Sequence, residues 1–164
     1  VIHNPESNMG NAVGVTPVLD MFNKGIPVGL GTDGYTPDMM ESYKVMNIIS
    51  KHEKRLPSVG WVEAPQMIFN NNPMIANRFM KNGKVGVLKE GYYADIIIVD
   101  YKAPTPLNES NINGHLLFGI SGRNIDTTII NGKIIMDERI LIGIDEEAIT
   151  AKSVELAQKV WNRI

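Results

Sequence analysis

The sequence predicts a mixed α/β fold made of two unlike halves. Up to about residue 82, short apolar runs alternate with stretches of helical periodicity, which is typical of βα units on a parallel sheet. From Gly83 onward, β-branched runs separated by turn residues replace that pattern and indicate antiparallel hairpins. We therefore expect two substructures, residues 1–82 and residues 83–164.

Composition and charge exclude several classes of protein. The 164 residues include no Cys, which excludes a disulfide framework, a thiolate zinc site and a cysteine nucleophile. The 16 basic and 18 acidic residues are mixed along the chain without a basic block, so nucleic acid is not an expected partner. No apolar run approaches the ~20 residues of a membrane-spanning helix. We expect a cytoplasmic protein that does not insert into membranes.

Two buried strands frame the first part of the chain. Residues 1–4 are expected to end one strand, and the apolar run 26–32 is expected to form a parallel strand that ends at Asp33. Between them, residues 16–24 carry apolar side chains at helical spacing, and Gly25 provides a helix stop. Active sites on parallel sheets lie at the carboxyl ends of the strands, so Asp33 stands where chemistry is expected.

Helical periodicity dominates the stretch that follows. An amphipathic helix is expected from Asp38 to Arg55, and two shorter helices are expected over residues 61–69 and 74–80. The segment Asn70-Asn71-Asn72-Pro73 is expected to separate these two shorter helices.

The second half is expected to be rich in strands. Residues 94–101 form a β-branched run, and residues 127–130 and 133–136 are expected to pair around Asn131-Gly132, whose tolerance of positive φ fits a type I′ turn. Asp145 is expected to cap a final helix with one apolar face. That face consists of Ile149, Leu156, Val160 and Ile164.

Asp33 is the first candidate for a role in chemistry. It leaves a buried strand and precedes Gly34, a position where a carboxylate can act on a substrate or simply hold an Asx-type turn. His115, a lone His beside Phe118, is expected to pack or to form hydrogen bonds rather than to bind a metal. A second polar cluster lies in a loop that Pro5 stiffens, where its side chains can orient a substrate or hold the loop. Its members are His3, Asn4, Ser7 and Asn8.

No complete catalytic motif is present. The three His residues, His3, His52 and His115, are far apart, and the spacings His-x-His, His-x-x-Glu-His and His-Glu-x-x-His are missing. The sequence also lacks a P-loop and a GxSxG elbow. The residues alone therefore indicate only part of a site.

Several motifs, in order, resemble one enzyme family. They are His3-Asn4-Pro5-x-Ser7-Asn8, Gly14-x-x-Pro17, the run from Gly25 to Gly34, Asn72-Pro73, the run from Gly83 to Asp100, and Asn131-Gly132-Lys133. This series is similar to amidohydrolases of the cytosine and guanine deaminase, S-adenosylhomocysteine deaminase and triazine chlorohydrolase group. The residues around Gly34-Tyr35-Thr36 and from His115 to Gly119 most resemble the aminohydrolases called SsnA.

The resemblance implies a fold and a chemistry. The chain would hold strands seven and eight of a distorted (β/α)8 barrel, followed by the C-terminal part of a small composite β-sandwich domain. The full-length enzyme would hydrolyse carbon–nitrogen bonds outside peptides as a deaminase of a small heterocyclic or ring amine, with zinc or iron activating a water. Asp33 would lie beside the metal and accept the water's proton. The pocket rim would hold His3, Asn4, Ser7 and Asn8.

The departures from that family define what the chain lacks. The paired His after strand one, the single His after strands five and six, and the acidic Glu near strand five have no counterpart here. We therefore regard the chain as a C-terminal fragment that binds no metal tightly by itself and has no deaminase activity alone. Uncovered barrel surface is further expected to cause self-association or homo-oligomers, or else a local rearrangement of residues 1–35.

Two other functions remain open from the sequence. The chain could be a non-catalytic assembly module that completes a barrel supplied by another polypeptide. It could also be an independent flavodoxin-like binding domain, although that fold needs more parallel strands than the sequence offers.

Overall fold

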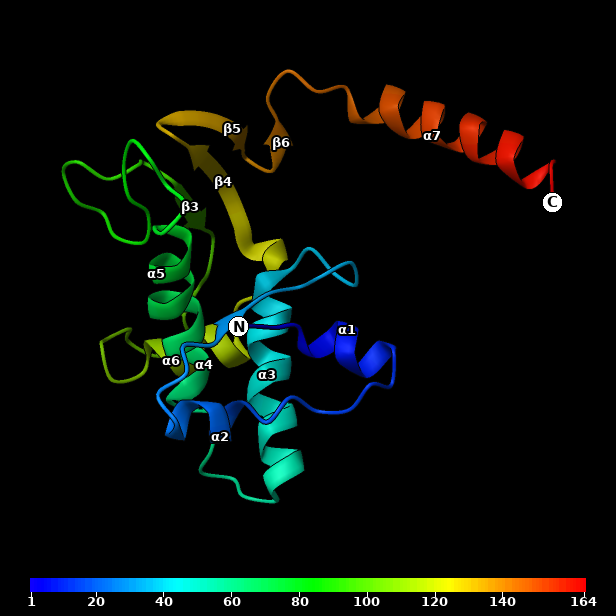
Figure 1. Cartoon of the computed structure of the whole chain (residues 1–164). Helices are drawn as coiled ribbons and strands as arrows, with labels where there is room; N and C mark the ends of the chain where they lie inside the picture. The colour runs from blue at the N-terminus through cyan, green and yellow to red at the C-terminus, as the bar shows by residue number, and fades with distance from the viewer.

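The computed structural model describes residues 1–164 and has two parts and a projecting helix (Figure 1). The first part holds a two-stranded parallel sheet, β1 (Ile2–His3) and β2 (Gly29–Leu30), with several helices packed beside it. The second part is an antiparallel sheet of four strands in the order β3-β4-β5-β6. Helix α7 (Glu146–Trp161) extends away from both parts (Figure 1).

The two parallel strands confirm the predicted pairing but are shorter than expected. Gly29 N donates to Val1 O at 2.8 Å, and Gly31 N donates to His3 O at 2.9 Å. On the opposite edge of β2 no strand is present, and the side-chain amide of Asn72 takes its place. Asn72 Nδ2 donates to Leu30 O, and Asn72 Oδ1 accepts from Leu30 N, both at 2.8 Å. Most of the predicted run 26–32 is therefore extended chain without a ladder partner.

Three helices pack around this short sheet. They are α1 (Pro5–Gly10), α2 (Val18–Asn23) and α3 (Met39–Lys54). The prediction of a loop over residues 3–8 was wrong, because Pro5 opens a helix in its first turn, where proline's missing N–H costs nothing. Helix α3 is confirmed, with Asp38 Oδ1 accepting from Met40 N at 2.8 Å and Arg55 ending the helix at φ 53°.

The two separate short helices expected after α3 form one continuous helical run. It consists of α4 (Glu63–Pro65), the π-helical segment η1 (Gln66–Asn71) and α5 (Asn72–Ala76). The predicted break at Asn70-Asn71-Asn72-Pro73 was wrong, since Pro73 lies in the first turn of α5 and breaks no hydrogen bond there. The wider π turn puts Asn71 and Asn72 beside β2, where Asn71 Nδ2 also donates to Val28 O at 2.7 Å.

The hydrophobic core lies between β2 and the helices. It consists of Val18, Val28, Leu30, Tyr43, Met46, Ala64, Met67 and Leu117. Leu117 comes from α6 (Ile112–Phe118), a helix that the sequence pattern did not predict. The second part of the chain thus contributes to the core of the first.

The antiparallel sheet contains β3 (Ile96–Val99), β4 (Ile125–Ile130), β5 (Lys133–Asp137) and β6 (Ile140–Leu141). The predicted hairpin between β4 and β5 is confirmed, with φ of 49° at Asn131 and 77° at Gly132, as a type I′ turn requires.

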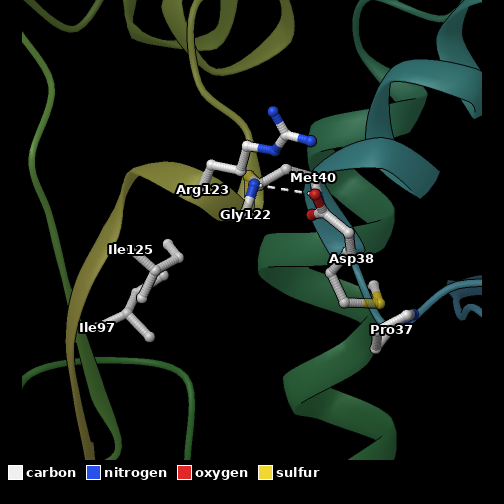
Figure 2. A pocket seen from close by; sticks show the side chains of 8 residues that line it. Pro37, Asp38, Met40, Ile97, Gly122, Arg123 and Ile125 are labelled. Atoms are coloured by element: carbon white, nitrogen blue, oxygen red, sulfur yellow. Dashed lines mark hydrogen bonds between the residues drawn. The ribbon is translucent and has the colours of Figure 1, made fainter. Parts of the chain in front are cut away.

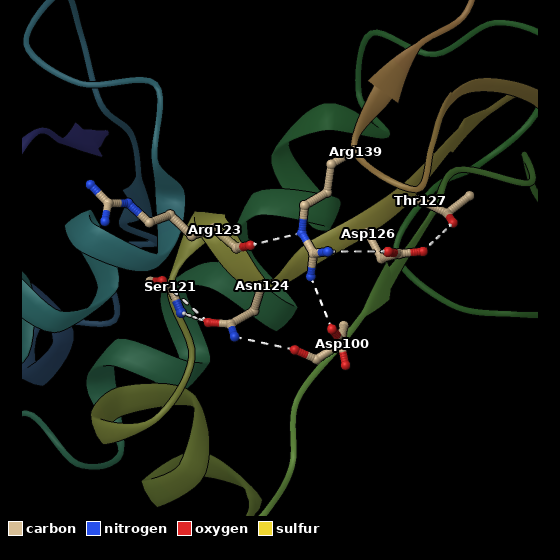
Figure 3. Close-up of polar contacts among 7 residues, drawn as sticks. All are labelled: Asp100, Ser121, Arg123, Asn124, Asp126, Thr127 and Arg139. Atoms are coloured by element: carbon tan, nitrogen blue, oxygen red, sulfur yellow. Dashed lines mark hydrogen bonds and ion pairs between the residues drawn. The ribbon is translucent and has the colours of Figure 1, made fainter.

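Arg139 joins three segments of this sheet (Figure 3). Its guanidinium lies 3.0 Å from Asp100 Oδ2 and 3.6 Å from Asp126 Oδ1, and its Nε donates to Arg123 O at 3.3 Å. Asn124, in the short helix η2 (Gly122–Asn124), donates from Nδ2 to Asp100 O at 3.2 Å. These contacts hold the end of β3 against the start of β4.

Helix α7 begins where the sequence predicted, with Asp145 Oδ1 accepting from Ala148 N at 2.9 Å. All of its residues are exposed, so its apolar face contacts no other part of the chain. Neither α7 nor any other helix is long and apolar enough to cross a membrane.

Candidate functional site

The two faces of the β1–β2 pair differ in what they contact. Because side chains alternate along a strand, His3 and Leu30 share one face, which is buried against the helices. The opposite face carries Gly29 and Gly31 beside Ile2 and Asn4. A Cβ on Gly31 would lie 2.8 Å from Ile2 Cγ2 and closer still to Asn4 Oδ1. On this face Ile75 of α5 lies beside Gly29 and Ile2, and Ile2 is 47% exposed.

Asp33 leaves β2 in a left-handed conformation with φ 54°. Non-glycine residues adopt this region at some cost, and such positions cluster at functional sites. Two contacts hold the carboxylate: Gly34 N donates to Oδ1 at 2.7 Å, and Ser7 Oγ donates to Oδ2 at 2.9 Å. A carboxylate has about four acceptor positions, so each oxygen retains one for a further ligand. Asp33 thus holds a turn through Gly34 N and still has oxygen acceptor positions open to a ligand.

The structure brings Ser7 to Asp33 and uses the other polar residues of the segment differently. Asn11 Nδ2 donates to Ser7 O at 3.0 Å, which supports Ser7 from the C-terminal end of α1. Asn8 Nδ2 donates to Thr16 Oγ1 at 2.9 Å and ties the following loop to the helix. Asn4 precedes α1, and its side chain makes no capping hydrogen bond there.

His3 and Glu6 lie on the interior side of the segment. His3 is 2% exposed, and neither ring nitrogen has a hydrogen-bond partner. Its burial lowers its pKa from 6.5 to about 4. Glu6 Oε2 accepts from Ser42 Oγ of α3 at 3.0 Å, whereas Oε1 has no partner. Burial raises the Glu6 pKa above its ordinary value, although the Ser42 hydrogen bond acts in the opposite direction.

The remaining His residues take no part in this cluster. His52 lies in the exposed last turn of α3. His115 is hydrogen-bonded on both ring nitrogens, at 2.8 Å to Tyr101 Oη and at 3.0 Å to Thr105 Oγ1, which confirms the predicted structural role. No three His, Asp or Glu side chains come together anywhere in the chain to hold a metal ion.

A cavity of about 480 Å³ lies where the two parts of the chain meet (Figure 2). Met40, Ile97 and Ile125 line it, and Asp38 Oδ2 accepts from Gly122 N at 2.9 Å beside it. Neither Asp33 nor any residue of α1 lines this cavity. The cavity therefore lies between the two parts of the chain and is separate from Asp33 and Ser7.

Comparison with known proteins identifies the family. The sequence pattern of the Amidohydrolase family matches residues 1–135. This chain belongs to the Amidohydrolase family. Within it, the chain is 37% identical over 153 residues to a 5-methylthioadenosine/S-adenosylhomocysteine deaminase of Dictyoglomus thermophilum. It is 34% identical over 168 residues to a protein of the same name from Pelotomaculum thermopropionicum.

The matched amidohydrolases are much longer than this chain. The alignments cover 91% and 99% of the chain, but only 35% and 38% of these two relatives. The chain thus spans about a third of the length of the curated relatives it matches.

Solved structures show the same fold. The superposition with an adenosine deaminase from Xanthomonas campestris with bound zinc covers 99% of this chain and 37% of the deaminase chain. Its TM-score is 0.83, at 20% sequence identity. An atrazine chlorohydrolase variant from Arthrobacter aurescens, complexed with zinc and atraton, covers 94% of the chain with a TM-score of 0.73 and 17% identity. The predicted fold, a mixed α/β part of an amidohydrolase barrel protein, is confirmed.

Proposed function

We propose that residues 1–164 supply the C-terminal part of a metal-dependent aminohydrolase that removes an amino group from a heterocyclic ring. The bond broken is a carbon–nitrogen bond outside a peptide, and the substrate is a small molecule. Relatives named as 5-methylthioadenosine/S-adenosylhomocysteine deaminases support this substrate class.

The observation that carries the proposal is the geometry of Asp33. Its carboxylate lies just past the carboxyl end of a parallel strand, where barrel enzymes hold their catalytic groups. Ser7 and Gly34 each orient one oxygen and leave acceptor positions free. A carboxylate held in this way can take a proton from a water and return it to a leaving amine.

The chain fits a metal site only as one contributor to it. Asp33 offers an oxygen ligand, yet no group of three or more His, Asp or Glu side chains is present to hold an ion, so we propose that zinc or iron binds tightly only in the full-length enzyme. A divalent cation in such a site makes a water acidic enough to deprotonate near neutral pH. Within this chain, Asp33 handles that proton.

Other residues of the site are assigned by the face they occupy. We propose that Asn4 and Ser7 lie at the substrate pocket, since they are beside Gly31 and Asp33. Asn8 holds the pocket rim through Thr16. For His3 we propose a packing role, because it is buried on the face that contacts the helices.

The proposal extends to the organisation of the protein. Residues 1–82 would complete the barrel, and residues 83–164 would form part of the small β-rich domain. The free edge of β1 and the exposed apolar face of α7 support self-association of the isolated chain. We place the protein in the cytoplasm because the chain has no Cys and the relatives carry a metabolic deaminase name.

A fusion protein tests the function. It joins the part of the D. thermophilum deaminase that this chain does not match ahead of residue 1, and ammonia release from 5-methylthioadenosine is measured with zinc present. We expect turnover in the fusion, none in the 164-residue chain, and a loss of at least ~100-fold in the Asp33→Asn fusion. A folded, zinc-loaded fusion without turnover, or full activity in Asp33→Asn, would refute the proposal.

The alternative is a non-catalytic module that completes a barrel supplied by another chain. The free edge of β1 favours it, because β1 pairs with β2 on one side only and its other edge can accept another strand. Under this alternative the Asp33→Asn substitution leaves assembly with the complementary polypeptide unchanged and no ammonia is released by the assembled pair.

A further inference from the structure

Tyr35, two residues after Asp33, is a large aromatic residue that the core does not use. It is 64% exposed, and its hydroxyl has no hydrogen-bond partner in the chain. Tyr43 is the aromatic residue buried in the core, whereas Phe69 and Trp61 are also partly exposed. Exposure of a single aromatic side chain needs no explanation by itself, so what matters is how the ring is held.

Gly10, the last residue of α1, receives the Tyr35 ring. A Cβ at Gly10 would lie 3.0 Å from both Cδ2 and Cζ of Tyr35 and closer still to Cε2. The φ of Gly10 is not positive, so glycine is not required there by the backbone. The ring approaches the Gly10 backbone closely, so a side chain at residue 10 would displace it.

The same face of α1 contacts both Tyr35 and Asp33. Ser7 donates to Asp33 Oδ2, and Gly10 packs against Tyr35. Residues three apart on a helix are neighbours, with Cβ positions about 5–6 Å apart. Helix α1 therefore sets the exposed ring beside the carboxylate, about one helical turn along the same face.

The loop that carries Tyr35 is fixed on both sides of the ring. On one side Asp33 is held by Ser7 and Gly34. On the other side Thr36 Oγ1 donates to Glu41 Oε2 at 3.0 Å and accepts from Asp38 N at 3.2 Å. These hydrogen bonds restrain the backbone on both sides of Tyr35, while the ring itself lies against Gly10.

We propose that Tyr35 is a substrate-binding residue whose exposed ring packs against a planar heterocycle while Asp33 handles the proton. Gly10 acts as the positioning residue that sets the ring. This inference rests on the proposed function for its choice of substrate class. Planar rings gain by packing against an aromatic side chain in offset or edge-on geometries, and that gain does not depend on the ring's hydrogen-bonding edge.

Variants of the fusion protein test the role of the ring. Tyr35→Ala removes it, Tyr35→Phe keeps it, and Gly10→Ala displaces it without changing Tyr35. For 5-methylthioadenosine we expect KM to rise roughly 5- to 100-fold in Tyr35→Ala, with a smaller rise in Gly10→Ala and no change in Tyr35→Phe. Gly114→Ala is the matched control, because no atom lies within 4 Å of a Cβ there. We expect it to leave KM unchanged.

The outcomes separate this inference from the proposed function. Turnover by the fusion with equal KM in the unsubstituted protein and Tyr35→Ala overturns the role of Tyr35 and leaves the function standing. A fusion that binds 5-methylthioadenosine without releasing ammonia overturns the function, and the affinities of the same variants, measured by calorimetry, then decide the role of Tyr35. A fusion without turnover or binding overturns both.

A second measurement uses the 164-residue chain alone. If the ring lies on Gly10, the NMR signals of the Gly10 α protons carry a ring-current shift that Tyr35→Ala removes and Tyr35→Phe retains. Identical Gly10 shifts in all three proteins would overturn the inference, whether or not the fusion folds.

Discussion

Ser7 Oγ donates to Asp33 Oδ2 across a distance of 2.9 Å, and this bond links the segments that follow two neighbouring parallel strands. Ser7 belongs to α1, the helix after β1, whereas Asp33 follows β2. The left-handed backbone at Asp33, with φ 54°, directs its side chain toward that helix. The proposed catalytic carboxylate is thus oriented by a contact between two βα units.

Replacing Ser7 by Ala tests whether this contact orients the carboxylate. In the fusion protein we expect kcat for 5-methylthioadenosine to fall about tenfold, equivalent to about 1.4 kcal/mol, because Asp33 loses one of its two fixed donors. KM should change little. The exposed Ser153→Ala on α7 serves as the control, and an unaltered kcat in Ser7→Ala would show that the bond has no catalytic role.

Burial of His3 predicts instability in acid. Its pKa is about 4 in the folded chain and 6.5 when unfolded, so the unfolded state binds the proton first as the pH falls. The resulting loss in the free energy of unfolding is absent above pH 6.5 and reaches roughly 3 kcal/mol near pH 4. Urea unfolding of the 164-residue chain at pH 7 and pH 4.5 should show this loss, and His3→Leu should reduce it. His52→Leu, at an exposed position, should leave that loss unchanged. An equal pH dependence of stability in the unsubstituted chain, His3→Leu and His52→Leu would show that His3 is not its cause.

Glu6 predicts a pH dependence of the opposite sign. Its pKa is raised in the folded chain, so the stability it contributes is complete below its unfolded pKa and is lost as the pH rises through the folded value. Glu6→Gln keeps an acceptor for Ser42 and removes the buried charge. Thermal melts should give a higher Tm for Glu6→Gln at pH 7 and the same Tm at pH 4. A lower Tm at pH 7 would mean that the charge has a partner.

The side-chain amide of Asn72 bonds both backbone groups of Leu30, so its removal should lower the free energy of unfolding strongly. In Asn72→Ala both the N–H and the C=O of the buried Leu30 lose their partner, and we expect a loss of about 2–4 kcal/mol in urea unfolding. Asn72→Asp retains the acceptor but sets a second acceptor against Leu30 O, so it should also destabilise. The neighbouring Asn70→Ala, which removes an exposed contact to Gln66, should cost less than ~1 kcal/mol. Equal losses at the two positions would rule out the edge-pairing role.

Local chemistry made part of the fold predictable. Asp145 was recognised as a helix cap, Asp38 as the start of a helix and Asn131-Gly132 as a hairpin turn, because each depends on residues within a few positions. The π-helical run through Asn71 and Asn72 was not predicted. Its cause is a pairing with β2, more than forty residues away, and no local pattern encodes that contact.

The site was predictable in position but not in detail. The order of motifs located Asp33 at a strand end, which the structure shows. Helix α1 was missed because Pro5 and the polar residues after it are typical of a turn, so the contacts of Ser7 with Asp33 and of Gly10 with Tyr35 could not be foreseen. The close approach of Tyr35 to a Gly10 that has no positive φ leaves no signal in a single sequence.

Anomalous diffraction at the zinc edge from crystals of the fusion protein tests the central claim most directly. The account predicts one zinc peak about 2.0–2.2 Å from a carboxylate oxygen of Asp33, on the side away from Ser7 and Gly34. A zinc peak whose ligands do not include Asp33, in a fusion that releases ammonia, would contradict it.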